Sequence, residues 1–132
     1  MAGEDVIVVP TGSANIASVF AAIGRAGRTA VLSRDPAVIA GATYVVLPGV
    51  GAFGAAMASL GEAGLVDVLR GRMAENRSTL CICLGMQVLF ETSEESDGVP
   101  GLGVVSGGIT KLRGHLRRRV PSMGWAAVRA AG

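Results

Sequence analysis

The fold is decided by the stretch Thr79-Leu80-Cys81-Ile82-Cys83-Leu84-Gly85-Met86-Gln87-Val88-Leu89-Phe90. It opens with a short apolar run after the polar Asn76-Arg77-Ser78, which is typical of a buried strand. Beyond Cys83 the spacing becomes helical, with Leu84, Val88 and Glu91 four and three residues apart. A cysteine therefore lies where a strand turns sharply into a helix. This is the arrangement of a nucleophile elbow, with sulfur in place of the usual serine oxygen.

The predicted elbow gives Cys83 three chemical advantages. The turn lifts the sulfur above the carboxyl edge of the sheet, and the helix N-terminus beneath it favours the thiolate. The backbone N–H of Leu84 points to the place where an oxyanion would form. An inert core thiol is the alternative for Cys83, but its position and flanking residues argue against it. Cys81, two residues earlier on the same strand, is expected to be a small buried hydrophobe.

The rest of the chain alternates strand and helix patterns. We expect strands at Val6–Val9, Thr29–Ser33, Tyr44–Leu47 and Thr79–Ile82, with later short strands at Gly108–Leu112 and Trp125–Val128. We expect helices from an Asn15 cap to Gly27, from Asp35-Pro36 to about Ala40, and over Ala55–Leu60 and Leu65–Met73. This order predicts an α/β fold, with an open, mostly parallel sheet and helices on both faces.

The loop Pro48–Gly54 follows the third strand, at the sheet edge where α/β proteins place their chemistry. Its glycines permit backbone conformations that direct N–H groups outward. Gly49, Gly51 and Gly54 also match G-x-G-x-x-G, a dinucleotide-binding fingerprint. The context disfavours that interpretation, because the next strand ends in Cys83 rather than in the acid that would hold a ribose.

Several of these residues carry a family resemblance. Cys83-Leu84-Gly85-Met86-Gln87 resembles the nucleophile motif of class I, triad-type glutamine amidotransferases. The additional segments Pro48–Gly54, Ala56-Met57, Val120-Pro121 and Met123-Gly124-Trp125 resemble the glutaminase-subunit family of imidazole glycerol phosphate synthase, from about Val6 to Val128. The chain departs from that pattern at Pro10-Thr11-Gly12-Ser13, where Asp-Tyr-Gly-Ser is usual, and at Ser122, where histidine is usual.

The resemblance implies a flavodoxin-like amidotransferase fold and a set of site residues. Cys83 would be the nucleophile, and the amide of Val50 or Gly51 would complete the oxyanion hole with Leu84. Gln87 and the Gly49–Gly51 backbone would orient L-glutamine. Met123 and Trp125 would face a cyclase subunit with a (β/α)8 barrel, in a heterodimer that passes ammonia to histidine biosynthesis. The resemblance implies no cofactor and no metal.

The general base of the family is missing from this pattern. Family members carry a His-Pro-Glu segment near the end of a longer chain, whereas the single histidine here is His115 and no acid follows Asp97. We therefore expect a C-terminally truncated domain that is nearly inactive as a glutaminase by itself, with His115 exposed to solvent. The alternative is a catalytically dead binding module or fragment of that subunit.

Composition sets broad limits. With 132 residues the chain fits one incomplete domain, and its 20 glycines and five aromatic residues predict a core of small side chains. No apolar run is long enough to cross a membrane, so a cytoplasmic location is expected.

Residues 99–132 hold six basic groups and no acid, including Arg117-Arg118-Arg119. We interpret these arginines as a solvated loop rather than a nucleic-acid site, because no aromatic residue is interleaved; docking to an acidic protein face stays open.

Overall fold

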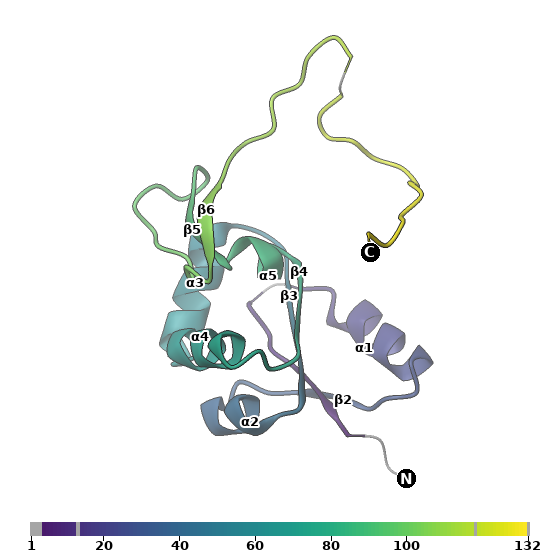
Figure 1. The fold of residues 1–132 in the computed structure, drawn as a ribbon, viewed down its shortest axis with the longest axis vertical. Coiled ribbons are helices and arrows are strands. Elements are labelled where there is room, and N and C mark those ends of the chain that lie inside the picture. The colour runs from purple at the N-terminus through teal and green to yellow at the C-terminus, as the bar shows by residue number, and fades with distance from the viewer. Residues whose placement is uncertain (1–3, 13, 118, 132) are drawn as a thin grey trace.

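The computed structural model of the chain describes residues 4–12, 14–117 and 119–131. The elements in order are β1 (Val6–Val8), α1 (Ile16–Arg25), β2 (Ala30–Leu32), α2 (Pro36–Gly41), β3 (Tyr44–Gly49), α3 (Phe53–Glu62), α4 (Val66–Ala74), β4 (Thr79–Cys83), α5 (Leu84–Gln87), β5 (Phe90–Ser93) and β6 (Val105–Ile109). Figure 1 shows this order, with the described residues after β6 forming an extended segment outside the helices and sheet. The alternation of strands and helices up to β4 agrees with the sequence-based prediction.

The main sheet is parallel and has the strand order β2-β1-β3-β4. In its register Val8 pairs with both Leu32 and Val46, and β3 continues alongside β4 until Gly49 lies opposite Cys83. The longest pairing in the sheet therefore ends at the predicted elbow. Because the strands are parallel, the loops after β1, β3 and β4 all leave from the same edge.

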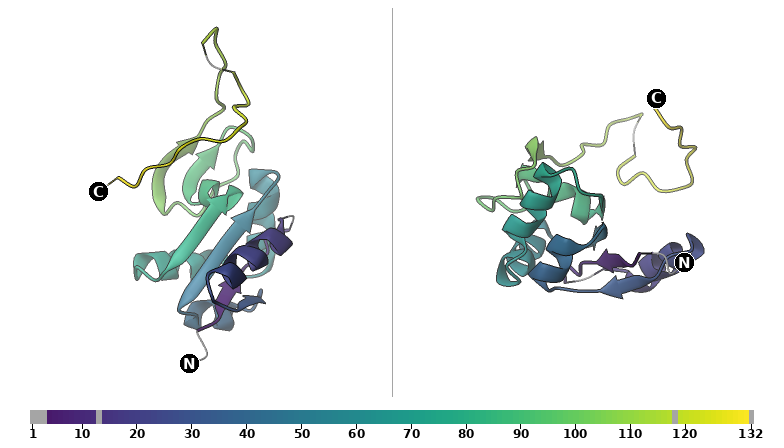
Figure 2. Two further views of the ribbon diagram at one scale, coloured as in Figure 1. Left: turned by 90° about the vertical axis from the view of Figure 1, so that its right-hand side faces the viewer. Right: turned by 60° about the horizontal axis from the view of Figure 1, so that its bottom comes forward.

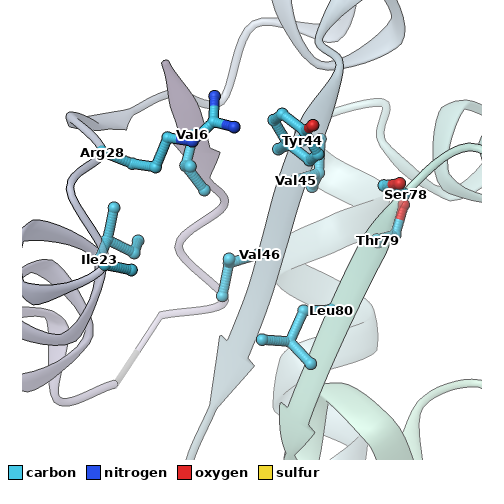
Figure 3. Close-up of a pocket in the computed structure, with 10 residues that line it drawn as sticks. Val6, Ile23, Arg28, Tyr44, Val45, Val46, Ser78, Thr79 and Leu80 are labelled. Carbon is cyan, nitrogen blue, oxygen red and sulfur yellow. The ribbon is translucent and has the colours of Figure 1, made fainter. Parts of the chain in front are cut away.

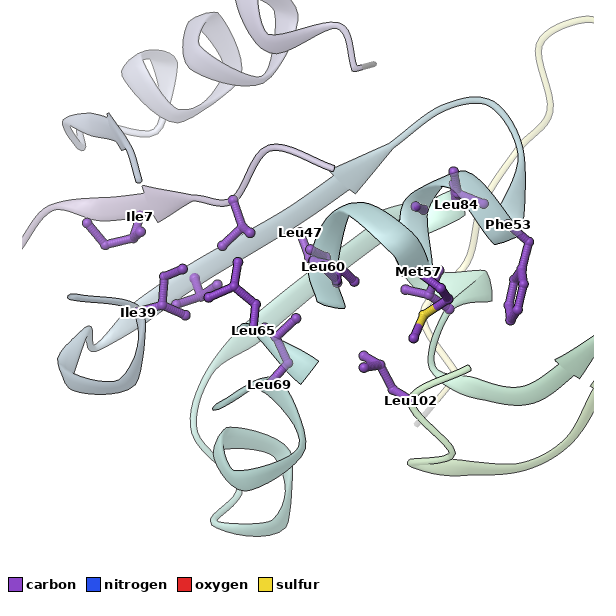
Figure 4. Packing of buried hydrophobic residues seen from close by; sticks show 14 residues of the cluster. Ile7, Ile39, Leu47, Phe53, Met57, Leu60, Leu65, Leu69, Leu84 and Leu102 are labelled. Atoms are coloured by element: carbon purple, nitrogen blue, oxygen red, sulfur yellow. The ribbon is translucent and has the colours of Figure 1, made fainter. Parts of the chain in front are cut away.

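Helices cover the two faces of the sheet unequally, as the two views in Figure 2 show. On one face, alternate strand residues such as Ile7, Val45 and Leu47 pack against residues from α2, α3, α4 and α5 (Figure 4). On the other face Val6, Val8 and Val46 pack against α1, whose apolar side chains are half-buried, and against Ala30 and Tyr44 of the neighbouring strands. The prediction of helices on both faces is confirmed, and the first face holds most of the core.

The thinly covered face leaves a hollow of about 540 Å³ between α1 and β4. Figure 3 shows Val46 and Leu80 side by side on the sheet, with Ile23 of α1 across from them. Leu80 is 59% exposed and Ile82 is 40% exposed, although both lie on strand β4. Parallel sheets are normally covered on both faces, so this apolar surface is unusual.

Local sequence signals account for several helix ends. Asn15 caps α1 through a 3.2 Å hydrogen bond from the Ser18 amide, and Asp35 caps α2 through a 2.8 Å bond from the Ala37 amide. Gly27, with a φ of 75°, ends the first helix as predicted. Buried Arg72 donates to the carbonyls of Ile39 and Ala42, and so pairs backbone groups around the end of α2.

The structure corrects the expectations beyond Cys83. The helix after the elbow ends at Gln87, and Glu91 lies in strand β5, which pairs with β6 in a separate two-stranded sheet. The strand expected at Gly108–Leu112 is Val105–Ile109, and Trp125–Val128 forms no strand. Helical spacing persists only for one turn, because pairing with a distant segment then determines the backbone.

None of the helices in the described ranges is both long and apolar enough to cross a membrane.

Candidate active site

Cys83 lies at a sharp strand-to-helix turn. It is the last residue of β4 and the N-cap of α5, with φ 55° and ψ −114°. A positive φ is unfavourable for any residue with a Cβ, and such strain is typical of functional sites that the surrounding structure holds in place. The side chain is exposed, which disagrees with an inert core thiol. The backbone therefore has the form expected of a nucleophile elbow.

Leu84 anchors the turn from the other side. Its side chain is 2% exposed and belongs to the main core, so the first residue of α5 is fixed by packing. Among the described residues, no side chain caps this helix N-terminus. The Leu84 amide is the first N–H of this helix N-terminus, the kind of group that can stabilise a negative charge. The helix has only four residues, so it contributes few aligned peptide dipoles, and the stabilisation that this N-terminus gives the Cys83 thiolate is small.

Glycines bring the Pro48–Gly54 loop against the elbow. A Cβ on Gly85 would lie 1.9 Å from the Leu47 carbonyl oxygen, so α5 lies directly on β3 at this point. A Cβ on Gly49 would lie 3.1 Å from the Leu84 Cβ and 3.2 Å from the Gly85 amide nitrogen. Beyond Gly49, Val50 is exposed and Gly51 has a φ of 99°. The Pro48–Gly54 loop and the turn at Cys83-Leu84, which are predicted to form the oxyanion hole, are therefore in contact at Gly49.

Cys81 and Cys83 have different surroundings although they are two residues apart. Cys81 is half-buried and packs against the main core, as predicted for a small buried hydrophobe. Burial raises the pKa of the Cys81 thiol to about 11. It is therefore protonated at neutral pH, and the exposed Cys83 is the better candidate nucleophile.

Gln87, the last residue of α5, lines a cavity of about 530 Å³. The other lining residues are Ser93, Glu94, Glu95, Ile109, Thr110 and Lys111. Side chains of both charge signs thus surround a space about one helical turn from the elbow. Such a lining suits a zwitterion such as a free amino acid. The nearness of the acidic residues Glu94 and Glu95 to Gln87 depends on the pairing of β5 with β6, which no local sequence pattern shows.

The same acidic turn disfavours dinucleotide binding. The Glu95 carboxylate accepts a 3.0 Å hydrogen bond from the Phe53 amide, and the Ser96 hydroxyl accepts a 2.9 Å bond from the Gly54 amide. These amides form the N-terminus of α3, where a dinucleotide would place its pyrophosphate. A carboxylate already occupies that position, and Gly49 and Gly54 serve close packing instead.

The remaining predicted residues lie outside this cluster. His115 is exposed, as predicted, and its Nδ1 accepts a 3.2 Å hydrogen bond from the Arg117 amide. Met123 and Trp125 are almost fully exposed on the extended C-terminal segment. Arg117 and Arg119 are also exposed, whereas the expectation for Arg118 lies outside the described residues. Within the described ranges, no three His, Cys, Asp or Glu residues are grouped as they would be to hold a metal ion.

The sequence was compared with protein-family models and with known proteins. No protein-family model matches the chain, whereas three subunits of one enzyme are similar to it. The chain is similar to imidazole glycerol phosphate synthase subunit HisH of Symbiobacterium thermophilum, with 42% identity over 123 residues that cover 93% of this chain and 57% of that protein. The same-named subunit of Lactiplantibacillus plantarum is 50% identical over 95 residues, which cover 72% of this chain and 46% of that protein. That of Thermus thermophilus is 40% identical over 126 residues, which cover 96% and 62%.

A solved structure described as a glutamine amidotransferase has a similar fold. Its TM-score is 0.61 at 24% identity, and the match covers 74% of this chain and 52% of that one. The chain therefore shares the α/β fold of that amidotransferase structure. In sequence it is a homologue of imidazole glycerol phosphate synthase subunit HisH, with 40–50% identity to the three subunits named above. It spans between 46% and 62% of the length of these three relatives.

Proposed function

We propose that this chain is the nucleophile-bearing part of a glutaminase subunit, which releases ammonia from L-glutamine. The observation that carries the proposal is Cys83, exposed at a φ of 55° on the elbow and paired in register with Gly49. Similarity to HisH subunits supports the same assignment and favours it over a catalytically dead binding module. The proposed domain is single and incomplete, and the proposed location is the cytoplasm.

In the proposed reaction the Cys83 thiolate attacks the side-chain carboxamide carbon of glutamine, and a carbon–sulfur bond forms. The amide of Leu84 and that of Val50 or Gly51 stabilise the negative charge on the carboxamide oxygen. The carbon–nitrogen bond then breaks as a general acid gives the leaving nitrogen a proton, and ammonia departs. Water hydrolyses the resulting glutamyl thioester, which restores the thiol and releases glutamate.

The cavity beside Gln87 is the proposed site for the amino-acid end of the substrate. Glu94 and Glu95 supply negative charge for the α-ammonium group, and Lys111 supplies positive charge for the α-carboxylate. Gln87 contributes an amide that can both donate and accept. Gly49 would orient the substrate through its backbone, next to the carbon that Cys83 attacks.

The proposed partner is the cyclase subunit of imidazole glycerol phosphate synthase, a (β/α)8 barrel that receives the ammonia in a heterodimer. Trp125 is 106% exposed and Met123 is 88% exposed, which suits side chains that another protein covers. The general base that the reaction needs has no candidate beside Cys83 among the described residues. We therefore expect this chain alone to release ammonia from glutamine only at a residual rate.

Active-site labelling tests the proposal without requiring turnover. A chloromethyl ketone analogue of L-glutamine should alkylate Cys83 with loss of chloride, and L-glutamine should protect it, as judged by peptide mass spectrometry. The matched control is D-glutamine, which has the same groups in the wrong arrangement and should protect poorly. Equal protection by both enantiomers would contradict the proposed glutamine site. The same extent of labelling in Cys83→Ala as in the wild type would also contradict it.

A further inference from the structure

Thr11 is one of three polar or charged residues that are buried within the described ranges. It is 4% exposed and lies in the loop after β1, at the sheet edge that carries the elbow. Its hydroxyl donates a 2.8 Å hydrogen bond to the carbonyl oxygen of Pro48. Pro48 immediately precedes the Gly49–Gly51 backbone proposed to form part of the oxyanion hole.

The Thr11 hydroxyl continues the hydrogen bonding between β1 and β3 by one step. The last backbone bond across this pair runs from the Val9 amide to the Val46 carbonyl, at 2.9 Å. Carbonyls alternate along a strand, so that of Pro48, two residues further on, faces the same neighbour. The backbone donor in register with this carbonyl would be the Thr11 amide, two residues after Val9. In the described residues the Pro48 carbonyl accepts from the Thr11 hydroxyl instead.

The same hydroxyl also touches the start of the oxyanion loop. A Cβ on Gly49 would lie 2.9 Å from the Thr11 Oγ1, 3.1 Å from the Leu84 Cβ and 3.2 Å from the Gly85 nitrogen. Gly49 thus packs closely against both the loop after β1 and the first turn of α5. Its partner in the sheet register is Cys83.

We propose that Thr11 is a positioning residue for the amidotransferase chemistry. Its hydrogen bond fixes the peptide plane between Pro48 and Gly49, and this orients the following amides toward the oxyanion that Leu84 also stabilises. Thr11 does not touch the substrate and acts only through this loop. The inference rests on the proposed function, since it assigns a role within the same site. It concerns this chain in particular, because the family pattern has tyrosine at this position.

Paired reagents test the role of Thr11 on the full chain. A chloromethyl ketone analogue of L-glutamine needs the oxyanion hole when the Cys83 thiolate attacks its carbonyl, whereas iodoacetamide reacts by direct displacement of iodide and does not. Thr11→Val should slow labelling by the ketone roughly two- to tenfold, the cost of one hydrogen bond, and leave the iodoacetamide rate unchanged. Thr11→Ser keeps the hydroxyl and should restore the wild-type ratio of the two rates.

Several outcomes would overturn the assignment. Wild-type behaviour of Thr11→Val with the ketone would show that the hydroxyl does not orient the hole. An equal loss with both reagents would show that the elbow itself has moved. Circular dichroism checks folding, and Thr11→Ala, which needs no room for a branched side chain, replaces the valine variant if that fails to fold.

A readout independent of glutamine separates this inference from the proposed function. In nitrogen-15 correlation spectra the amide resonances of Gly49 and Val50 should shift in Thr11→Val and remain near wild type in Thr11→Ser. If L-glutamine fails to protect wild-type Cys83, the proposed function is wrong, and these shifts still decide whether Thr11 positions the loop. Unchanged amide resonances in the valine variant would refute the positioning role directly.

Discussion

At the scale of single residues, the two cysteines of strand β4 differ in exposure because their backbone conformations differ. Cys81 follows the regular alternation of β4 and packs into the core, where burial raises its pKa to about 11. Cys83 adopts a φ of 55° and leaves the strand, so its side chain is exposed. One backbone dihedral angle thus separates a structural thiol from a candidate nucleophile.

The first prediction concerns alkylation of the two thiols. At neutral pH iodoacetamide should modify Cys83 at least about tenfold faster than Cys81, because Cys81 is both partly covered and protonated. Peptide mass spectrometry after timed quenching measures the two rates in one sample. Labelling of Cys81 should accelerate only as the pH approaches 11. Equal labelling of both cysteines at neutral pH would remove the case for a specially placed Cys83.

The second prediction concerns alkaline stability. The folded chain holds the Cys81 proton up to a pKa of about 11, whereas the ordinary value is 9.0. Between these pH values the unfolded chain binds fewer protons than the folded one, so the free energy of unfolding falls as the pH rises. The contribution is complete below pH 9 and is lost toward pH 11.

Cys81→Ala should therefore flatten the dependence of the unfolding midpoint on pH in this range, with Cys83→Ala as the matched control. Urea titrations at several pH values measure the midpoint. The same slope in wild type and Cys81→Ala would show that other groups cause the alkaline loss.

At the scale of elements, the site depends on how closely α5 lies on β3. Gly85 makes this possible, since any Cβ there would overlap the Leu47 carbonyl oxygen. Gly49 and the opposite residue Cys83 extend the β3–β4 pairing to the edge of the sheet. The Glu95 and Ser96 side chains then cap α3 and tie the separate β5–β6 sheet to the glycine loop. Three elements distant in sequence are therefore joined around one turn.

The third prediction tests this close approach. Gly85→Ala should lower the free energy of unfolding by about 2–3 kcal/mol, because the new methyl group forces α5 away from β3. The control is Gly61→Ala in α3, where a Cβ would meet nothing within 4 Å. That variant should gain about 0.5–1 kcal/mol, since alanine loses less backbone entropy in a helix. Urea unfolding of both proteins measures the difference, and equal effects would contradict the packing described for Gly85.

At the scale of the whole molecule, the sheet is covered on one face and partly open on the other. Leu80 and Ile82 of β4 are exposed beside α1, which packs against only part of that face. Exposed apolar surface on a parallel sheet favours binding of hydrophobic dyes and association between molecules.

The fourth prediction follows from this open face. The double variant Leu80→Thr/Ile82→Thr should bind less anilinonaphthalene sulfonate and associate less at high concentration, with a change in unfolding free energy of about 0.5 kcal/mol or less. Threonine keeps the strand preference while adding polarity. The matched control is Leu112→Thr, which makes the same kind of substitution at an exposed leucine on the extended segment after β6. Dye fluorescence and sedimentation measure both effects, and unchanged dye binding in the double variant would contradict the openness of this face.

Sequence patterns predicted the first four strands and their helices because each is a local signal. Apolar runs between turn residues mark β1 and β3, and side chains at fixed offsets mark the caps at Asn15 and Asp35. The elbow was predictable for the same reason, since a strand, a cysteine and a helical turn follow one another directly. The strand β5 was missed because Phe90–Ser93 pairs with residues 105–109. A pattern read over a few neighbouring residues does not show such pairing between distant segments.

The amino-acid sequence by itself determined the class of fold, the position of Cys83 at a turn and the glycines that must lie close to it. Only the tertiary structure decided that Thr11 bonds to Pro48, that Glu95 caps α3, and that Gln87 shares a cavity with Lys111. The physical reason is the distance along the sequence over which each interaction acts. Dihedral preferences and apolar periodicity act between near neighbours. Hydrogen bonds and packing across a sheet join residues tens of positions apart, and they form only once the strands have paired in their folded register.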